Sequence, residues 1–500
     1  MDRRDFLKKT GLALAGSAIG SACGRRTVEP PEDTARDDRA PGAPAEDAAR
    51  DGKWVILVTI DTLRADHVSC YGYPRPTTPF LDEMAANGVR FANCFSHCGS
   101  THPSHTTMFT GLEQVQHGVE CNRSPQVAPC ILTLPQVFEE RGYETAAFTS
   151  AAVVTPLGRL FREFNAREYR PGTYQPAGQT VNQARSWLAG RSTGENVFLW
   201  VHVFDPHQWH LDRQPQSRHR AMQIRSDGER DELLAYWRDV QLKATQAVRP
   251  RPAKKLDGDV EKFVRKQNNY DARIRYVDDE LRKLHTVVQE RGPREVFWMI
   301  TSDHGEGLGN HEYANHAMFI YHEILRVPLI MRFPDDAHAG TVLDEAASHT
   351  DLFPTLAGIV GESPERQLFP VQGRSLMSLV EGGDGGCDEQ AIFAHRQLRH
   401  PRFMLSQLWE PDRIFALHDR NWKYIHHERG QSEFYDLSAD PFEMENLEPS
   451  APAAMATLKA EALERFEAFK RDAAKRVELD PREEEVDPGR EEALDALGYA

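Results

Sequence analysis

Acidic and imidazole side chains follow three apolar segments of the sequence, at the point where each segment ends. These residues are Asp61 after "VTI", Asp205 and His207 after "VHVF", and Asp303 and His304 after "MITS". A single aspartate in such a place could cap the next helix. Three together, two of them with a nearby histidine, instead indicate carboxylates and imidazoles that converge on a metal ion.

A second candidate is the hydroxyl-rich stretch "GSTHPSHTTMFTG", residues 99–111. Read alone, a Ser or Thr followed by Pro is typical of a helix N-terminus, with Thr101 or Ser104 as the cap. The alternative is that one hydroxyl is a nucleophile. The two roles are compatible, because the amides at a helix N-terminus also stabilise an anionic ester.

Strands that alternate with helices must position these residues. The run "KWVILVTID" (53–61) is β-branched and continuous, as in a strand buried on both faces of a parallel sheet. Further strands are expected at 144–150, 196–204, 295–302 and 327–333, and helices at 77–88 and up to Gly292. This alternation predicts an α/β domain, and ligands of such sheets bind at the carboxyl ends of the strands.

The composition changes along the chain and predicts its organisation. The catalytic α/β domain is expected at 52–380, with the polar section 208–268 as an insertion or lid over the site. A C-terminal subdomain at 381–475 is expected to hold a small antiparallel sheet and a final helix at about 451–475. Residues 476–500 form an acidic tail, and residues 24–51, rich in Pro, Ala and charge, a disordered tether.

Residues 1–23 carry the paired arginines Arg3 and Arg4 before a weakly apolar stretch, which is typical of a twin-arginine export signal. A disordered basic tail is the alternative. Cys23 at the end of "GSAC" could accept a lipid, so the protein is expected in the periplasm or anchored in a membrane at the cell surface. The formal net charge of −16 argues against a nucleic-acid partner, because phosphate backbones require a basic surface.

Over about residues 52–450 the chain resembles the sulfatase branch of the alkaline phosphatase superfamily. The resemblance rests on motifs in the right order: "VTIDTLRADHVSCYGYPRPTTPFLDEMAANGVRF", "STHPSHTTMFTG", "TLPQVFEERGYETAAF", "HVFDPH", "SDHGEGLGNH", "HTDLFPTL" and "EFYDLSADPFEMENL". It implies an α/β/α sandwich with a mostly parallel central sheet. A smaller C-terminal α+β domain would pack against the sandwich.

The resemblance also implies roles for single residues. It places the attacking group at Thr101, and His105, His207 or His316 could protonate the leaving group. A first metal site would consist of Asp61, Thr101, Asp303 and His304. A second would need Asp205 or His207 with His316 and, as a weaker candidate, His311. So many imidazoles favour zinc or manganese, although calcium or magnesium is possible.

One departure from the family decides the expected chemistry. Sulfatases oxidise a Cys, sometimes a Ser, to formylglycine at the position of Thr101, and the β-methyl of Thr prevents that oxidation. No formylglycine is therefore expected. The resemblance then favours hydrolysis of a phosphodiester or phosphomonoester through a covalent Thr101 intermediate, on a small-molecule, glycan-linked or lipid-linked substrate. The alternatives are a sulfatase working without formylglycine, a phospho-group transferase, and an inactive sulfatase-shaped binding protein.

Overall fold

The computed structural model describes residues 52–122, 127–151, 159–168, 174–211, 253–383, 391–396, 414–428, 431–450 and 453–479, with short pieces at 222, 228–229, 231–233 and 235. The expected export signal, Cys23, the tether, much of 208–252 and the tail beyond 479 lie outside the described residues. No helix within the described part of the chain is long and apolar enough to cross a membrane.

A mostly parallel eight-stranded sheet forms the centre of the large domain. Its order is β4 (Ala166–Glu168), β3 (Glu144–Thr149), β5 (Val197–Val203), β1 (Lys53–Ile60), β6 (Glu295–Thr301), β7 (Arg326–Arg332), β2 (Val89–Phe95) and β8 (Thr341–Ser348). Among these strands, β7 alone runs antiparallel to its neighbours. The predicted α/β sandwich with a mostly parallel sheet is confirmed.

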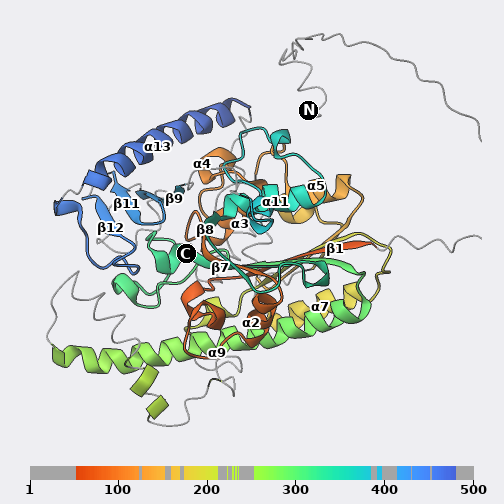
Figure 1. Ribbon diagram of the computed structural model, residues 1–500, viewed down its shortest axis with the longest axis horizontal. Coiled ribbons are helices and arrows are strands. Elements are labelled where there is room, and N and C mark those ends of the chain that lie inside the picture. The colour runs from red at the N-terminus through yellow and green to blue at the C-terminus, as the bar shows by residue number, and fades with distance from the viewer. Residues whose placement is uncertain are drawn as a thin grey trace, which may run out of the picture. The chain divides into compact units, whose positions relative to one another are not determined.

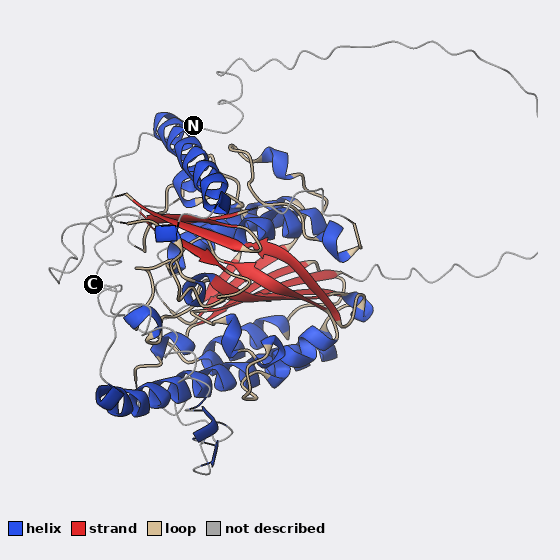
Figure 2. Cartoon of the chain, turned by 60° about the vertical axis from the view of Figure 1, so that its left-hand side comes forward, coloured by secondary structure: helices blue, strands red, loops and turns tan. Residues whose placement is uncertain are grey.

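Helices cover both faces of this sheet (Figure 2). On one face lie α2 (Pro79–Ala86), α7 (Ala177–Leu188) and α9 (Ala253–Arg291). On the other lie α3 (Thr101–Thr110), α5 (Leu134–Glu140) and α11 (Leu352–Ile359). Strand β1 shows why both faces must be covered, since Trp54 and Ile56 join one hydrophobic core while Val55 and Leu57 join the other. Shorter helices are α4 (Gln114–His117), α6 (Arg159–Arg162), α10 (His322–Leu325) and α12 (Met377–Val380).

Helix α9 differs from the prediction in its length. The sequence placed 208–268 in an insertion or lid, but residues 253–268 belong to this helix, which spans 39 residues (Figure 1). The helix begins directly after Pro252, and no proline interrupts the chain from there to Arg291. The residues between are mostly good helix formers, so the helix expected to end near Gly292 extends further toward the N-terminus than the sequence analysis predicted.

The C-terminal part forms a separate small antiparallel sheet of order β12 (Glu433–Asp436), β11 (Trp422–His427), β10 (Ile414–His418) and β9 (Ile392–Arg396). Helix α13 (Ala453–Leu479) packs against it, as Figure 1 shows. The shared core contains Phe393, Phe415, Tyr424, Phe466 and Phe469. The expected antiparallel sheet and final helix are both present, and the helix continues beyond residue 475.

Phe138 on α5 offers a test of core packing in the large domain. Its ring is fully buried and stacks on Phe198 with ring centroids 4.0 Å apart. Phe138→Ala should lower the free energy of unfolding by about 3–5 kcal/mol, through lost burial and a residual cavity. Urea unfolding followed by circular dichroism measures the change. The control Leu463→Ala, at a side chain that is 37% exposed, should stay within about 0.5 kcal/mol of the parent. Equal effects of the two variants would contradict this account of the core.

Candidate active site

Three adjacent parallel strands bring the predicted residues to one edge of the sheet. Strand β1 pairs with β5 on one side and with β6 on the other, with Ile60 opposite Val203 and Thr59 opposite Thr301. Asp61 follows the end of β1, and the chain continues from β6 into the segment 302–304. Because the strand ends are in register, side chains far apart in the sequence converge there.

Asp61, Asp303 and His304 form a compact group of candidate metal ligands. All three are fully buried, and one ligand atom from each lies within 4.8 Å of the others. Asp61 Oδ1 and Asp303 Oδ2 are buried without a hydrogen-bond partner. His304 Nδ1 lies 2.9 Å from the carbonyl oxygen of Gly305, to which it can only donate, so Nε2 presents its lone pair to the group. Two orphaned carboxylate oxygens and one imidazole nitrogen fit a divalent cation.

The electrostatics of the group point the same way. Burial raises the pKa of Asp61 well above its ordinary value, and the charges of Asp303 and Glu306 add to the rise. Burial opposes ionisation of Asp303 too, but the neighbouring imidazoles, led by His304, hold its pKa at about 2. Burial lowers the pKa of His304 to about 4, which keeps the ring neutral. When both are ionised, two buried carboxylates this close together need a compensating positive charge.

Thr101 is the first residue of helix α3, and its hydroxyl faces this group. Thr101 Oγ1 lies 3.5 Å from Asp61 Oδ2 and 3.3 Å from His304 Nε2. The helix has Ser100 at its N-cap position, and that residue makes no side-chain cap hydrogen bond. Ser104 donates its hydroxyl hydrogen to the carbonyl oxygen of Asp303. The Thr101 hydroxyl is thus directed at the candidate metal ligands, as a nucleophile requires.

His207 and His316 extend the group on another side. The ring centroid of His316 is 4.6 Å from that of His304, and the ring of His207 is 4.9 Å from that of His316. Glu306 lies 3.2 Å from His316 Nδ1, and the ring of Phe204 stacks on His207 at 4.2 Å. The structure therefore brings both predicted histidines to the site, where they could meet a substrate or its leaving group.

Three other predicted site residues, His105, Asp205 and His311, make contacts that do not fit the roles predicted for them. His105 lies with Nδ1 2.8 Å from the carbonyl oxygen of Thr101 and Nε2 3.1 Å from Thr59 Oγ1, so neither nitrogen is placed to protonate a leaving group.

Asp205 and His311 are likewise not part of the candidate metal-ligand group. The carboxylate of Asp205 accepts hydrogen bonds from the hydroxyl of Tyr174 and from the amide of Ala177, at the start of α7. His311 lies with Nδ1 2.6 Å from Glu323 Oε1 and Nε2 3.0 Å from the carbonyl oxygen of Glu443. The polar atoms of Asp205 and His311 form hydrogen bonds that fix loops and a helix end. The sequence pattern could not reveal these contacts.

The structure adds two residues that the sequence analysis missed. His202 of β5 lies with Nε2 3.5 Å from Asp61 Oδ2, and Glu306 accepts a hydrogen bond from Trp209 Nε1 in addition to its contact with His316. A signal existed for His202, because a histidine within the otherwise apolar run "FLWVHVF" is an uncommon buried polar residue.

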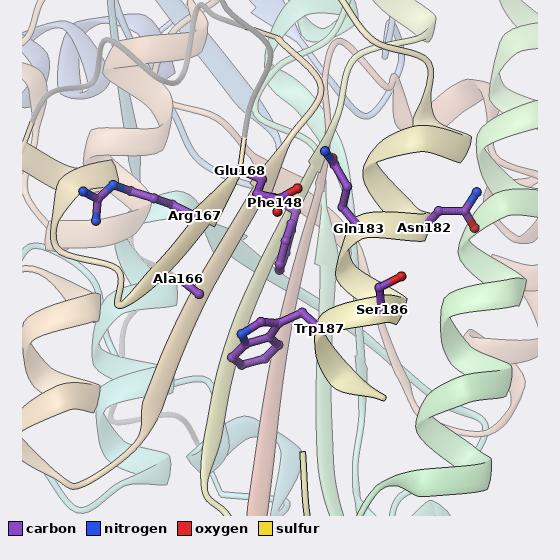
Figure 3. A pocket seen from close by; sticks show the side chains of 8 residues that line it. All are labelled: Phe148, Ala166, Arg167, Glu168, Asn182, Gln183, Ser186 and Trp187. Atoms are coloured by element: carbon purple, nitrogen blue, oxygen red, sulfur yellow. The ribbon is translucent and has the colours of Figure 1, made fainter. Parts of the chain in front are cut away.

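A pocket of about 620 Å³ lies elsewhere, where helix α7 faces strands β3 and β4 (Figure 3). Its lining includes Phe148, Glu168, Gln183 and Trp187, and none of the candidate site residues. The strand-end group, whose orphaned polar atoms point to a ligand, is therefore the candidate active site.

Comparison with known proteins identifies the family of this chain. The sulfatase family model matches residues 53–362, and the model for the C-terminal region of N-sulphoglucosamine sulphohydrolase matches residues 309–471. The N-acetylglucosamine-6-O-sulfatase of Bacteroides thetaiotaomicron is 24% identical over 468 residues, covering 79% of this chain and 82% of that protein. The multifunctional alkaline phosphatase superfamily protein PehA of Trinickia caryophylli is 24% identical over 477 residues, covering 79% and 91%.

Solved structures share the fold. The phosphonate monoester hydrolase of Agrobacterium radiobacter superposes with a TM-score of 0.64 at 20% identity, over 85% of this chain and 96% of that one. A structure in complex with its substrate D-glucosamine-2-N,6-O-disulfate superposes with a TM-score of 0.63 at 21% identity, over 87% of this chain and 100% of that one. Since the family model spans well over half of the chain, this protein belongs to the sulfatase family of the alkaline phosphatase superfamily, as a hydrolase of anionic esters.

Proposed function

We propose that this protein hydrolyses a phosphate or phosphonate ester with the Thr101 hydroxyl as nucleophile. The observation that carries the proposal is the position of Thr101 Oγ1, at the start of a helix and within 3.5 Å of both Asp61 and His304. A hydroxyl in this place is suited to attack an anionic ester. The similarity to a phosphonate monoester hydrolase and to the multifunctional protein PehA supports this substrate class.

Threonine at this position favours phosphorus over sulfur. An aldehyde hydrate can expel sulfate by breaking its own carbon–oxygen bond, but the β-methyl of Thr101 prevents formation of the aldehyde. A sulfated threonine would have to be hydrolysed at sulfur, which is slow. A phosphothreonine is open to in-line attack by water at phosphorus.

Asp61, Asp303, His304 and Thr101 would hold a divalent metal ion, with zinc or manganese favoured because an imidazole belongs to the set. Such an ion supplies positive charge that lowers the pKa of the Thr101 hydroxyl and offsets the charge of the pentacoordinate state. Removal of the metal should abolish turnover, and reloading should restore it.

In the proposed reaction, Thr101 Oγ1 forms a bond to phosphorus while the bond from phosphorus to the leaving oxygen breaks. The proton of Thr101 leaves toward Asp61 Oδ2, its hydrogen-bond acceptor in the structure. His316, whose ring lies 4.6 Å from that of His304, or His207 beside it gives a proton to the departing alkoxide. Water then attacks phosphorus and gives a proton back to the histidine, while the bond from phosphorus to Thr101 Oγ1 breaks and Thr101 recovers its proton from Asp61.

The leaving group is proposed only as a class. Relatives include an N-acetylglucosamine-6-O-sulfatase and a Δ4,5-hexuronate-2-O-sulfatase, so a glycan-linked ester is one candidate, beside small-molecule and lipid-linked esters. A sulfatase working without formylglycine and a transferase to an alcohol acceptor are the competing functions. We also propose twin-arginine export to the periplasm or cell surface, with a lipid on Cys23 as a possible anchor.

Thr101→Ala should reduce turnover by about 1000-fold or more, because the variant lacks the attacking oxygen. Metal content, measured by elemental analysis, should remain close to the parent value, since two carboxylates and an imidazole are retained. Thr101→Ser, which keeps the hydroxyl, should retain substantial activity. An alanine variant with parental turnover would exclude Thr101 as the nucleophile.

The substrate class can be tested with a panel of nitrophenyl esters assayed on one enzyme preparation. We expect a higher kcat/KM for the phosphomonoester, phosphodiester or phosphonate than for the sulfate, because the phosphorylated threonine is more readily hydrolysed. Product analysis with and without added alcohol separates hydrolysis from transfer. Faster turnover of the sulfate ester would reverse the proposed ranking.

The metal ligands can be tested with a pair of matched variants. Asp303→Asn should weaken metal binding by about 100-fold or more, because a charged ligand is lost. Asp205→Asn is the control, since the carboxylate of Asp205 is engaged by Tyr174 and the amide of Ala177. Affinity is measured by competition with a chelator. Equal losses in the two variants would contradict the assignment of Asp303 as a ligand.

A further inference from the structure

The pocket between helix α7 and the edge of the central sheet combines aromatic and polar side chains. It encloses about 620 Å³, and its walls come from β3, β4 and α7. Phe148 and Trp187 lie with ring centroids 6.2 Å apart, and Glu168 and Gln183 point into the same space (Figure 3). An aromatic wall with a few convergent polar groups is the usual lining of a small-molecule site.

Trp187 is held in place and keeps a hydrogen-bond donor unused. The guanidinium of Arg191 lies over the indole, 4.9 Å from the ring centroid, and the half-buried indole packs against the core beneath it. Trp187 Nε1 donates to no acceptor within the described part of the chain. A largely buried indole usually pairs this N–H. The hydrogen is therefore available to a ligand in the pocket.

Gln183 is oriented by a buried neighbour. Gln175 is 3% exposed, and its amide lies 3.2 Å from the carbonyl oxygen of Thr149, which only accepts, so the atom there is the donor Nε2. The same Nε2 lies 2.9 Å from the amide of Gln183, which must offer its oxygen. Both hydrogens of Gln183 Nε2 then remain for a ligand, since no described residue accepts them.

Glu168 supplies an acceptor and sets the charge of the pocket. It stands opposite Phe148 on the neighbouring strand, so the two side chains share one face of the sheet. Its exposed carboxylate has no hydrogen-bond or ion-pair partner among the described residues. Arg167 also lines the pocket, but its guanidinium donates to the carbonyl oxygen of Phe164 and points away from Trp187 (Figure 3). An anionic ligand would be repelled by Glu168, so the pocket favours an uncharged one.

These groups together match a sugar ring better than a flat aromatic ligand. Each hydroxyl of a sugar both donates and accepts, which suits the N–H groups of Trp187 and Gln183 and the carboxylate of Glu168. The carbon-bound hydrogens on one face of a pyranose carry partial positive charge, and the face of an aromatic ring is negative. A purely aromatic ligand would leave the polar groups of the pocket without partners.

The pocket is separate from the candidate active site but belongs to the same sheet. Phe148 of β3 pairs with Val201 of β5, which pairs with Val58 of β1, three residues before Asp61. Neighbouring strands are about 4.8 Å apart, so β3 and β4 lie about 10 Å and about 14 Å from β1. A short oligosaccharide has the length to reach from one place to the other.

We propose that this pocket binds an uncharged sugar unit of a glycan, with Trp187 and Phe148 against the ring and with Gln183 and Glu168 on its hydroxyls. This binding site goes beyond the proposed function, because it requires neither the metal ion nor Thr101. It favours the glycan-linked ester among the substrate classes left open there, since it holds a glycan beside the strand-end group.

Binding is tested by calorimetry on the full chain with neutral tetrasaccharides of glucose, mannose, galactose or N-acetylglucosamine, and with a sulfated heparin tetrasaccharide. At least one neutral tetrasaccharide should bind, and Trp187→Ala should weaken that binding by about 10-fold or more. Trp422→Ala is the matched control, because it removes a half-buried tryptophan that stacks on Phe434 in the small sheet. The control should bind like the parent. Binding of the sulfated tetrasaccharide should not depend on Trp187.

A second variant removes hydrogen-bond donors and leaves the indole in place. Gln183→Leu should weaken binding of the neutral tetrasaccharide by about 3–10-fold. Gln289→Leu, at an exposed position of α9, should leave it at the parental value. Thr101→Ala should also bind the neutral tetrasaccharide like the parent, so the pocket is tested apart from turnover. Thermal unfolding shows that each variant is folded.

Failure of every neutral tetrasaccharide to bind would overturn this proposal and leave the proposed function intact. Parental affinity in both Trp187→Ala and Gln183→Leu would place sugar binding elsewhere and overturn it as well. If only the sulfated tetrasaccharide bound in a manner that depends on Trp187, the uncharged class of ligand would be wrong. Parental turnover in Thr101→Ala would contradict the proposed nucleophile alone, without bearing on the pocket.

Discussion

The proximity of two buried carboxylates, Asp61 and Asp303, is the constraint on which the site depends. Parallel pairing of β1 with β6 places them at neighbouring strand ends, and water is excluded from both. Ionised carboxylates in such a place cost several kcal/mol each unless amides, imidazoles or a cation compensate them. The backbone amides of Thr62 and His304 donate hydrogen bonds to Oδ1 of Asp303, at 3.1 Å and 2.9 Å. Oδ2 of Asp303 accepts no hydrogen bond from the described residues.

The small antiparallel sheet contributes to this site from a distance. Lys423 of β11 is fully buried, pairs with Glu443 at 2.5 Å and donates to the carbonyl oxygen of Ile320 at 2.6 Å. Glu443 in turn accepts from the amide of His322. These contacts fix the segment between Asp303 and β7, which carries His316. The C-terminal part of the chain therefore fixes the position of the segment that carries His316.

Within the sulfatase family, this chain combines the shared fold with a threonine at position 101, at the start of α3. Structures that share its fold include a phosphonate monoester hydrolase and a protein bound to a disulfated glucosamine, so the scaffold does not select the ester by itself. In the function proposed for this chain, Thr101 carries that choice. His105 and His202 belong to the same centre, because they share Thr59 Oγ1 and contact Thr101 and Asp61, respectively.

Local patterns in the sequence were sufficient to predict the α/β class, the strand ends and the convergence of Asp61, Asp303 and His304. Hydrophobic period and β-branching are properties of short segments, and parallel strands place their carboxyl ends at one edge of the sheet. These patterns could not distinguish candidate metal ligands from residues whose polar atoms form other hydrogen bonds. Asp205 and His311 stand in motifs as suggestive as that of His304, yet their polar atoms are engaged by Tyr174, Glu323 and Glu443. The place of His202 beside Asp61 likewise depends on strand register, because the pairing of β1 with β5 sets Thr59 opposite His202. Only the folded chain determines such contacts, because the hydrogen-bond partners lie on strands and loops that are far apart in the sequence.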